Sequence, residues 1–579
     1  MVCQHLDRAP PGPAFFRNEL NSTPRQMTAP RLLACLLFPI AIAAQTAATA
    51  PTPTALPAGA PHIVVETVGP EGWRLRLGPT NLGSLLESQR GRELWQPMTL
   101  PVFGTWQQLL GDEGAFEASK QRWLGYGGTV RLSLWFAPRD GSLQPARGVV
   151  VFAADGRTDM KLLAADVQQM QQSLGEWTTR DIGGETLRVS ERDGLLLTAP
   201  IPAGDHFVLA LGEAEQLPAV LQHARGTVPA AGSKPAAPNT PALRWQVETG
   251  ALIAMAAALD DGDAKTFAAT GFGSLATLLG SVVGAGPHVQ IEQAGTFPNG
   301  PRGLLAAFCP TTTGLSALQA LVPADSNGAK VGRFDLRALY ETFVEIVEKT
   351  GWAADDTDVR KDIRDELGID PGADLLAHAT DEIAFLGSPF QEVERPQDIT
   401  WALLVKLRDA AKFDAALKTL LTHAKPNLSH SETVKVDDVE LHRYGNLLQY
   451  DLWLAVGHGV FFLGGGRDAE ANLTALLQQA AKLPADAKGT LPASHTELQR
   501  YLPPGLSGIA HGDFDSLLKL PAEWLPMLLG EVLPFGRGNG EADPEQAEAL
   551  RALLKEHHLN AVRTATGYAD ATWRWRLFW

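Results

Sequence analysis

Cysteine is almost missing from this chain of 579 residues. Only three are present, and because Cys3 and Cys35 lie within the first 44 residues, the rest of the chain holds Cys309 alone. An intramolecular disulfide is therefore excluded if those first residues are removed. Since Cys309 follows the apolar stretch Leu304–Phe308, we expect it to be a small buried side chain and not a nucleophile.

The chain also lacks a surplus of positive charge. It has 49 Lys and Arg residues against 65 Asp and Glu residues, which gives a formal net charge of -16. Binding to a phosphate backbone needs a concentrated face of Lys and Arg, and no run of such residues is present, so we expect no nucleic-acid partner. The length exceeds that of a single hydrophobic core, and two or more core units are predicted.

No apolar run reaches the roughly 20 residues that a membrane-spanning helix needs. The most apolar segment near the start follows Met27 and Arg31, runs over residues 32–44, and contains the small-x-small sequence Ala41–Ala43. This order is typical of a secretory signal. We predict a cleaved signal peptide over residues 27–44, and hence a periplasmic or secreted protein.

The segments on either side of the signal support this interpretation. Residues 1–26 are polar and rich in proline, and they form a possible mis-annotated extension upstream of a true start at Met27. Residues 45–61 form a flexible spacer of Ala, Thr and Pro. Two alternatives remain. The signal could stay uncleaved and anchor the protein as a helix, or Cys35 could carry a lipid. In a lipoprotein signal the apolar run precedes the cysteine, whereas here it follows Cys35. A membrane is a partner only in these cases.

The remaining sequence is predicted to be an internal duplication. Five pairs of segments recur in the same order, four with an offset of 253–255 residues and the last with an offset of 270, which indicates an insertion in the second copy. The pairs are 76–88 with 330–342, 148–155 with 401–409, 207–224 with 460–480, 249–260 with 504–515, and 288–308 with 558–578. We predict two repeats, residues 62–310 and 311–579, which pack about a pseudo-twofold axis.

The last pair assigns the end of the chain to a strand. Trp573, Trp575, Leu577 and Trp579 alternate along it and are predicted to share one face. In the first repeat the same face is predicted to carry the small residues of a strand at 303–309.

Each repeat is predicted to be a layered α+β unit with helices packed on a largely antiparallel sheet. In the first copy an apolar strand ends near Asp155, and a helix with apolar residues from Met160 to Leu174 follows, capped by Thr158. In the second copy Asp409 is the expected cap. Gly183-Gly184 and Asp437-Asp438 are predicted hairpin turns between alternating strands.

No constellation for catalysis or cofactor binding is found in the sequence. A nucleophile elbow and a phosphate-binding glycine loop are absent. The only weak metal candidates are His430, Asp437, Asp438 and His442, which are all residue types that bind metals. The strand-turn-strand prediction places both aspartates at an exposed turn, where Asp is favoured for backbone reasons alone. We therefore expect no metal, no cofactor and no catalytic residue.

Three stretches, residues 366–387, 399–421 and 489–503, carry a family resemblance. They contain a turn "GIDPGADLL" before a strand, a helix start "DAAKF" and a late "GTLPAS". In these features residues 320–520 resemble an uncharacterised family of exported bacterial proteins that is defined only as a domain of unknown function. The resemblance implies export and an α+β repeat, and it transfers no activity, cofactor or functional residue. The first repeat departs from the family pattern at residues 111–123.

These observations lead to two functional hypotheses. The first is an exported, non-enzymatic binding or scaffold protein of the bacterial envelope, whose partner is an unidentified envelope protein or ligand. The alternative is an envelope hydrolase with an unrecognised His or carboxylate site between the two repeats. Clustered buried titratable groups in a pocket between the repeats would favour the hydrolase.

Overall fold

The structure is a computed structural model of the whole chain. It describes residues 59–90, 107, 112–139, 141–172, 175–227, 240–259, 261–323, 326, 328–349, 358–387, 398–424, 429–447, 450–484, 487–513 and 552–579. The predicted signal peptide, residues 27–44, and the segments around it lie outside the described residues, as does the segment 514–551.

Strands β1 to β11 form the N-terminal part of the fold. Its strands are β1 (Ile63–Val68), β2 (Thr129–Arg139), β3 (Ser142–Phe152), β4 (Trp177–Ile182), β5 (Glu185–Arg192), β6 (Leu195–Thr198), β7 (Ile201–Ala203), β8 (His206–Gly212), β9 (Leu243–Val247), β10 (Thr277–Ala285) and β11 (His288–Thr296). Its helices are α2 (Pro70–Leu77), α3 (Asn81–Glu87), α5 (Glu113–Gly125), α6 (Met160–Gln171), α7 (Leu217–Thr227), α8 (Thr249–Ala257), α9 (Asp261–Thr270) and the short η4 (Phe272–Ser274).

The C-terminal part follows with strands β12 to β21. Its strands are β12 (Gly328–Arg333), β13 (Ala379–Gly387), β14 (Trp401–Leu407), β15 (Ser429–Val436), β16 (Val439–Leu447), β17 (Tyr450–Gly457), β18 (Val460–Gly465), β19 (Leu506–Asp513), β20 (Ala561–Ala569) and β21 (Thr572–Phe578). Its helices are α10 (Gly303–Phe308), α11 (Leu336–Lys349), α12 (Val359–Leu367), α13 (Ala410–Ala424), α14 (Ala469–Ala480), α15 (Ala493–Thr496) and the short η5 (Ala317–Leu321), η6 (Pro371–Leu375), η7 (Leu376–His378) and η9 (Gln499–Tyr501).

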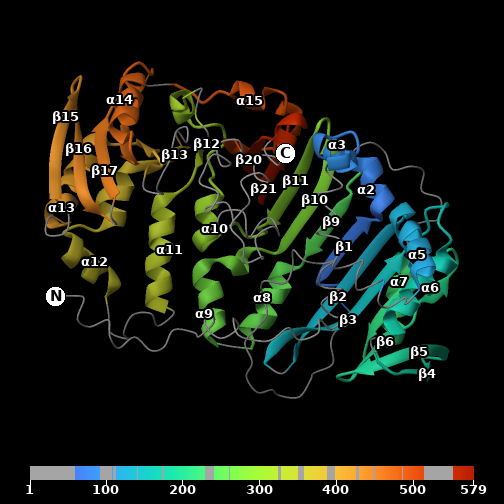
Figure 1. The fold of residues 1–579 in the computed structure, drawn as a ribbon. Coiled ribbons are helices and arrows are strands. Elements are labelled where there is room, and N and C mark those ends of the chain that lie inside the picture. Colours follow the sequence, from blue (N-terminus) through green and yellow to red (C-terminus); the bar gives the residue numbers. More distant parts are fainter. Residues whose placement is uncertain are drawn as a thin grey trace.

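The described pairings connect these strands into one continuous antiparallel sheet, so the fold is α+β. The strand order is β4-β5-β6-β8-β3-β2-β1-β9-β10-β11-β21-β20-β19-β12-β13-β14-β18-β17-β16-β15, and β7 also pairs with β8. Figure 1 shows the N-terminal part in blue and green on one side, the C-terminal part in yellow and orange on the other, and β11 and β21 between them.

Helices cover both faces of the sheet at its two ends. In the N-terminal part, α7 packs on one side, with Val149 and Val208, and α6 packs on the other, with Phe152 and Phe207. In the C-terminal part, α14 and η5 pack on the side of Leu404, whereas α13 packs on the opposite side. Because adjacent residues of a strand point to opposite faces, each end of the sheet becomes the middle of a three-layer core.

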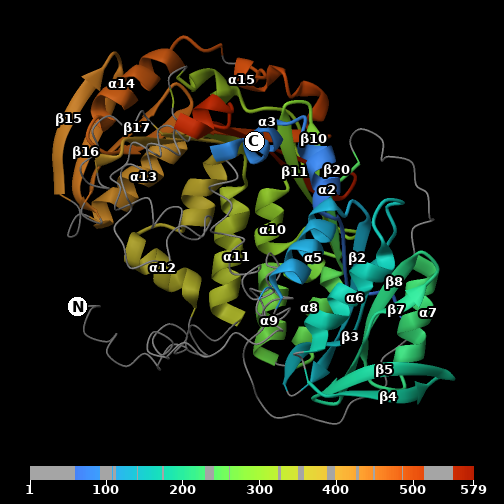
Figure 2. The same cartoon turned by 45° about the vertical axis from the view of Figure 1, so that its right-hand side comes forward.

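The central strands have one apolar face, which we call the tryptophan face. It is defined by Trp245, Trp573 and Trp575, whose strands pair in register with one another through β10 and β11. Helix α2 packs on one end of it, and Trp573 packs at the other end with Leu305 of α10. Figure 2 shows α8, α9, α10 and α11 side by side next to these strands, as does Figure 1.

Cys309 is buried in the cluster at this second end, as expected from its apolar surroundings. Burial raises the pKa of its thiol to about 12, so the group stays protonated at neutral pH. The thiol therefore acts as a small packing group.

Strands β11 and β21 join the two parts. Their register runs from Gln290 opposite Phe578 to Thr296 opposite Thr572. Phe578 is 1% exposed and packs with Leu498 and Ile509 on the face opposite to the tryptophan face.

Several local predictions are confirmed. Gly183 and Gly184 form the turn between β4 and β5 with φ angles of 60° and 83°, and Asp437 begins the turn between β15 and β16 with a φ of 54°. The side chain of Asp409 accepts a hydrogen bond from the backbone N–H of Lys412 at the start of α13. These positions were predictable because each depends on short-range backbone chemistry.

Other local predictions are wrong. Asp159, and not Thr158, caps α6, because the Thr158 hydroxyl donates to Asp155 instead. The segment from Gly303 to Phe308 is the helix α10 and not a strand. Two of the five segment matches set unlike elements against each other. Residues 249–260 contain α8 where 504–515 contain β19, and the end of 288–308 is α10 where the end of 558–578 is β21. Alternation in short apolar runs does not separate a strand from a buried helix.

None of the helices in the described part of the chain combines the length and the apolar character needed to cross a bilayer.

We expect Phe578→Ala to lower the free energy of unfolding by about 3–4 kcal/mol, because it leaves a cavity where the two parts of the sheet meet. Urea titration followed by circular dichroism measures the change. The matched control is Phe343→Ala on α11, since that side chain is 51% exposed, and it should cost less than about 1 kcal/mol. Equal losses in both variants would show that β21 contributes no more than a surface side chain.

Candidate functional site

Charged side chains are confined to one face of the six central strands β2, β1, β9, β10, β11 and β21. Two rows of mutually paired residues cross these strands on this face, which we call the arginine face. The first row is Arg131, Glu66, Arg244, Ser281, Glu292 and Arg576, and the second is Ser133, Val64, Gln246, Leu279, Ala294 and Arg574. The intervening row on the tryptophan face is Leu132, Val65, Trp245, Gly280, Gln293 and Trp575, which carries no charge.

The charges of the first row form ion pairs across the strands. Glu66 lies 3.9 Å from Arg131 and 3.6 Å from Arg244, and Arg576 lies 3.0 Å from Glu292. These are cross-strand neighbours of opposite charge, which stabilise a sheet modestly. The pair between Glu292 and Arg576 also bridges the N-terminal and C-terminal parts.

Positive charge exceeds negative charge on the arginine face. The two rows hold four arginines and two glutamates. Arg244 is the most open of the paired residues, with 57% of its side chain exposed. Arg131, Arg574 and Arg576 each keep one buried guanidinium nitrogen without a hydrogen-bond partner in the described part of the chain. The glutamates therefore leave part of the donor capacity of these arginines unused.

The first row is apolar and buried elsewhere in the sheet. Beyond Arg576 it continues through Ala565, Ile509, Val331, Ala384, Leu404 and Phe462, and each of these is at most 4% exposed. Beyond Arg131 it continues through Val151 and Val208, which are buried under α7. One continuous row is thus apolar and covered at both ends, and charged and partly exposed in the middle.

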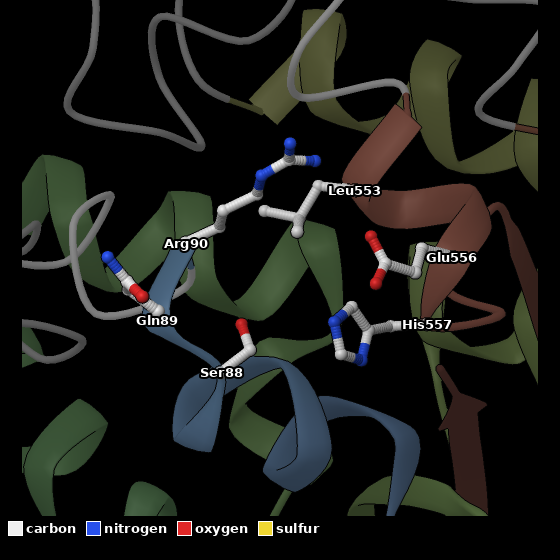
Figure 3. Close-up of a pocket in the computed structure, with 6 residues that line it drawn as sticks. All are labelled: Ser88, Gln89, Arg90, Leu553, Glu556 and His557. Atoms are coloured by element: carbon white, nitrogen blue, oxygen red, sulfur yellow. The ribbon is translucent and has the colours of Figure 1, made fainter.

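A shallow pocket of about 390 Å³ lies where the end of α3 meets the segment 552–557. Its lining residues are Ser88, Gln89, Arg90, Leu553, Glu556 and His557 (Figure 3). At its edge the hydroxyl of Ser84 is 3.1 Å from Nδ1 of His557. A serine next to a histidine is one element of nucleophilic catalysis, but an orienting carboxylate and oxyanion donors are also needed.

Three histidines with lowered pKa values lie near β11, β19 and α15. Burial lowers the pKa of His495 to about 4, and burial also lowers the pKa values of His288 and His511. Nε2 of His495 contacts the carbonyl of Thr564 at 3.4 Å, and its Nδ1 contacts Ser494. Because His495 is fully buried and both its ring nitrogens have partners, it holds α15 in place and is not positioned as a general base.

The predicted metal candidates are spread along one hairpin. Asp437 and Asp438 form its turn, and Nδ1 of His442 on β16 is 3.1 Å from the hydroxyl of Thr433. His430 lies on β15 opposite Tyr444, and its side chain is outside the described residues. Among the residues whose side chains are described, no group of three or more His, Cys, Asp or Glu is arranged to hold a metal ion.

The sequence did not reveal the arginine face. In "TWRWRLF" a charge stands at every second position, whereas "VETV" and "LRWQV" each carry a single charge. That pattern tells which side chains share a face of one strand. It does not tell which strands are neighbours.

No family model and no curated protein matches the chain. Among solved structures, the chain is similar to crystal forms III, IV and I of TP0453, with TM-scores of 0.22, 0.21 and 0.20 and identities of 8%, 8% and 9%. These matches cover 45%, 44% and 42% of this chain and 85%, 83% and 80% of the other. Similarity at this level carries no argument about fold or function.

Acid should destabilise the protein through His495. Its pKa is about 4 in the folded chain and ordinarily about 6.5 in an unfolded one, so the unfolded state takes up the proton first as the pH falls. The contribution of neutral His495 is complete above pH 6.5 and is lost progressively down to pH 4, by about 3 kcal/mol in total.

Urea titrations between pH 7.5 and pH 4 measure this loss. His495→Gln should remove about that much of the acid-induced decrease, whereas His458→Asn, at the exposed turn between β17 and β18, should retain it. An unchanged acid profile in His495→Gln would contradict the assignment.

Proposed function

We propose that this chain is an exported, non-enzymatic binding or scaffold protein of the bacterial envelope, and that the arginine face holds its partner. The observation that carries the proposal is that the first row of the sheet changes from buried and apolar at both ends to charged and partly exposed in the middle. A buried apolar row needs no further explanation in a stable fold. A stretch of charges in its middle adds little stability, because exposed ion pairs contribute about 0–1 kcal/mol each. A charged, partly exposed stretch between two covered ends favours a binding role.

We further propose that the fold is an internal duplication of two α+β repeats, residues 62–310 and 311–579. Strand order supports this, since β4-β5-β6-β8-β3-β2-β1-β9-β10-β11 and β15-β16-β17-β18-β14-β13-β12-β19-β20-β21 connect their strands in the same sequence. Under this correspondence β21 matches β11, and not the segment at 303–309.

The pairing of β11 with β21 supports a pseudo-twofold axis. Glu292 and Arg576 are each the fifth residue of the last strand of a hairpin, and they lie opposite each other. A twofold axis between two copies places equivalent positions opposite each other in this way. The same charged residue at both positions would repel its copy, whereas Glu292 and Arg576 attract each other.

Export is supported by the signal-like segment at residues 27–44 and by the resemblance of residues 320–520. When the gene is expressed from Met27 in a Gram-negative host, the protein recovered from the periplasmic extract should begin near Gln45. N-terminal sequencing of that material measures this. Full-length protein that remains with the membrane pellet would instead favour an uncleaved anchor.

The alternative function is an envelope hydrolase. The specific observation in its favour is the contact between Ser84 and His557 at the edge of the pocket, which joins segments from both predicted repeats. The arrangement lacks a carboxylate hydrogen-bonded to His557 among the described residues. We therefore favour binding.

Retention of envelope material by the immobilised mature protein tests the choice. Arg244→Glu should reduce the retained mass at least about fivefold, because it reverses the most exposed charge of the arginine face. Ser84→Ala should retain as much envelope material as the wild type. The amount of soluble fragments released from that material should also equal that of the wild type. Loss of fragment release in Ser84→Ala, with retention unchanged in Arg244→Glu, would establish the hydrolase and reject the binding function.

A further inference from the structure

The ligand of the arginine face can be narrowed further if the proposed binding function holds. We infer that the arginine face binds an acidic polysaccharide, laid across the strands along the two charged rows.

Charge is the first reason. The two rows carry a surplus of two positive charges, whereas the whole chain carries a formal net charge of -16. A local positive patch on an acidic protein attracts anions to that patch and repels them elsewhere. All the cations are arginines, whose planar guanidinium groups bind carboxylates through two parallel hydrogen bonds.

Spacing is the second reason. Adjacent strands lie about 4.8 Å apart, so Arg131 and Arg244, which are separated by β1, are about 10 Å apart. A small anion can reach one of these arginines at a time. An extended polymer with repeated carboxylates can reach Arg244 and Arg131 at once, whose side chains are 57% and 28% exposed, which raises its affinity without any new kind of contact.

The side chains between the charges favour a sugar over other polymers. Gln246 and Ser281 occupy positions of the same two rows and are not buried, and amide and hydroxyl groups both donate to and accept from sugar hydroxyls. Neither row contains an aromatic residue, on which the bases of a single-stranded nucleic acid would stack. Within these two rows the only large apolar side chain that is well exposed is Leu279, at 38%, which is little for the centre of a protein interface.

The test is direct binding of the full mature chain to defined polymers. Polygalacturonate is the carboxylated polysaccharide, dextran is the uncharged one, and polyphosphate is an anionic polymer without sugar. We expect the protein to bind polygalacturonate and not dextran, with an affinity that falls as salt is raised from 20 to 300 mM, since exposed charges are screened.

Variants locate the binding. Arg244→Glu should weaken binding to polygalacturonate at least about tenfold, because one charge-assisted contact is replaced by repulsion. Arg244→Gln, which keeps the length of the side chain, should weaken it about three- to tenfold. The matched control is Arg192→Glu on β5, which makes the same charge change at a side chain that is 62% exposed at the far end of the sheet, and it should change the affinity less than twofold.

The remaining outcomes separate the polysaccharide inference from the proposed binding function. Binding of polyphosphate but not polygalacturonate, with sensitivity to Arg244→Glu, would overturn the polysaccharide inference and leave the binding face intact. Retention of envelope material that depends on Arg244, without binding to any of the three polymers, would have the same meaning. Equal binding of polygalacturonate by the wild type and Arg244→Glu would overturn the inference, and unchanged retention of envelope material in that variant would reject the proposed function as well.

Discussion

The antiparallel pairing of β11 with β21 is the constraint on which the rest of the molecule depends. Their register fixes which residues of the N-terminal part lie level with residues of the C-terminal part. A shift of one residue would move every side chain of β21 to the opposite face. It would bring Arg574 and Arg576 onto the apolar tryptophan face and remove Phe578 from its buried cluster. The alternation of charge and tryptophan at the end of the chain therefore encodes the register as well as the faces.

Because of this register, one row of paired residues runs across most of the sheet. Parts of that row are covered by helices and other parts are exposed to solvent. Where helices such as α7 and α14 cover a row, its residues are Val, Leu, Ile, Ala and Phe. Where the row passes over β1, β9 and β10 the residues are charged or hydroxylated, and Arg244 projects into solvent. The opposite side of the same strands is mostly apolar, and its central row carries no charge. Whether helices cover a stretch of the row thus decides whether its residues are apolar or charged. A stretch that no helix covers can bind a partner.

Sequence reasoning succeeded where short-range chemistry decides the outcome. The turns at Gly183-Gly184 and Asp437-Asp438, the cap at Asp409 and the burial of Cys309 need only a few neighbouring residues. The α+β class followed from the alternation of strand and helix patterns. Helix α10 was missed because six apolar or small residues carry no distinguishing period, and the cap of α6 was misplaced by one residue because Asp159 and Thr158 both suit that position.

The candidate site depended on information that one sequence does not contain. Glu66 meets Arg131 and Arg244, which come from two distant segments, and Glu292 meets Arg576 near the end of the chain. The sequence contains no run of basic residues and therefore gives no sign of a positive face. The structure assembles a modest one from single arginines on separate strands. Nonlocal strand order, and not composition, creates this surface.

The most direct measurement of the central claim is the chemical accessibility of Arg244. The folded protein is labelled with the arginine reagent phenylglyoxal, with and without bound envelope material, and modified arginines are quantified by mass spectrometry. If the arginine face is the binding surface, bound material protects Arg244 while Arg192 is modified to the same extent in both samples. Equal modification of Arg244 in both samples, while the material is demonstrably bound, would contradict the account.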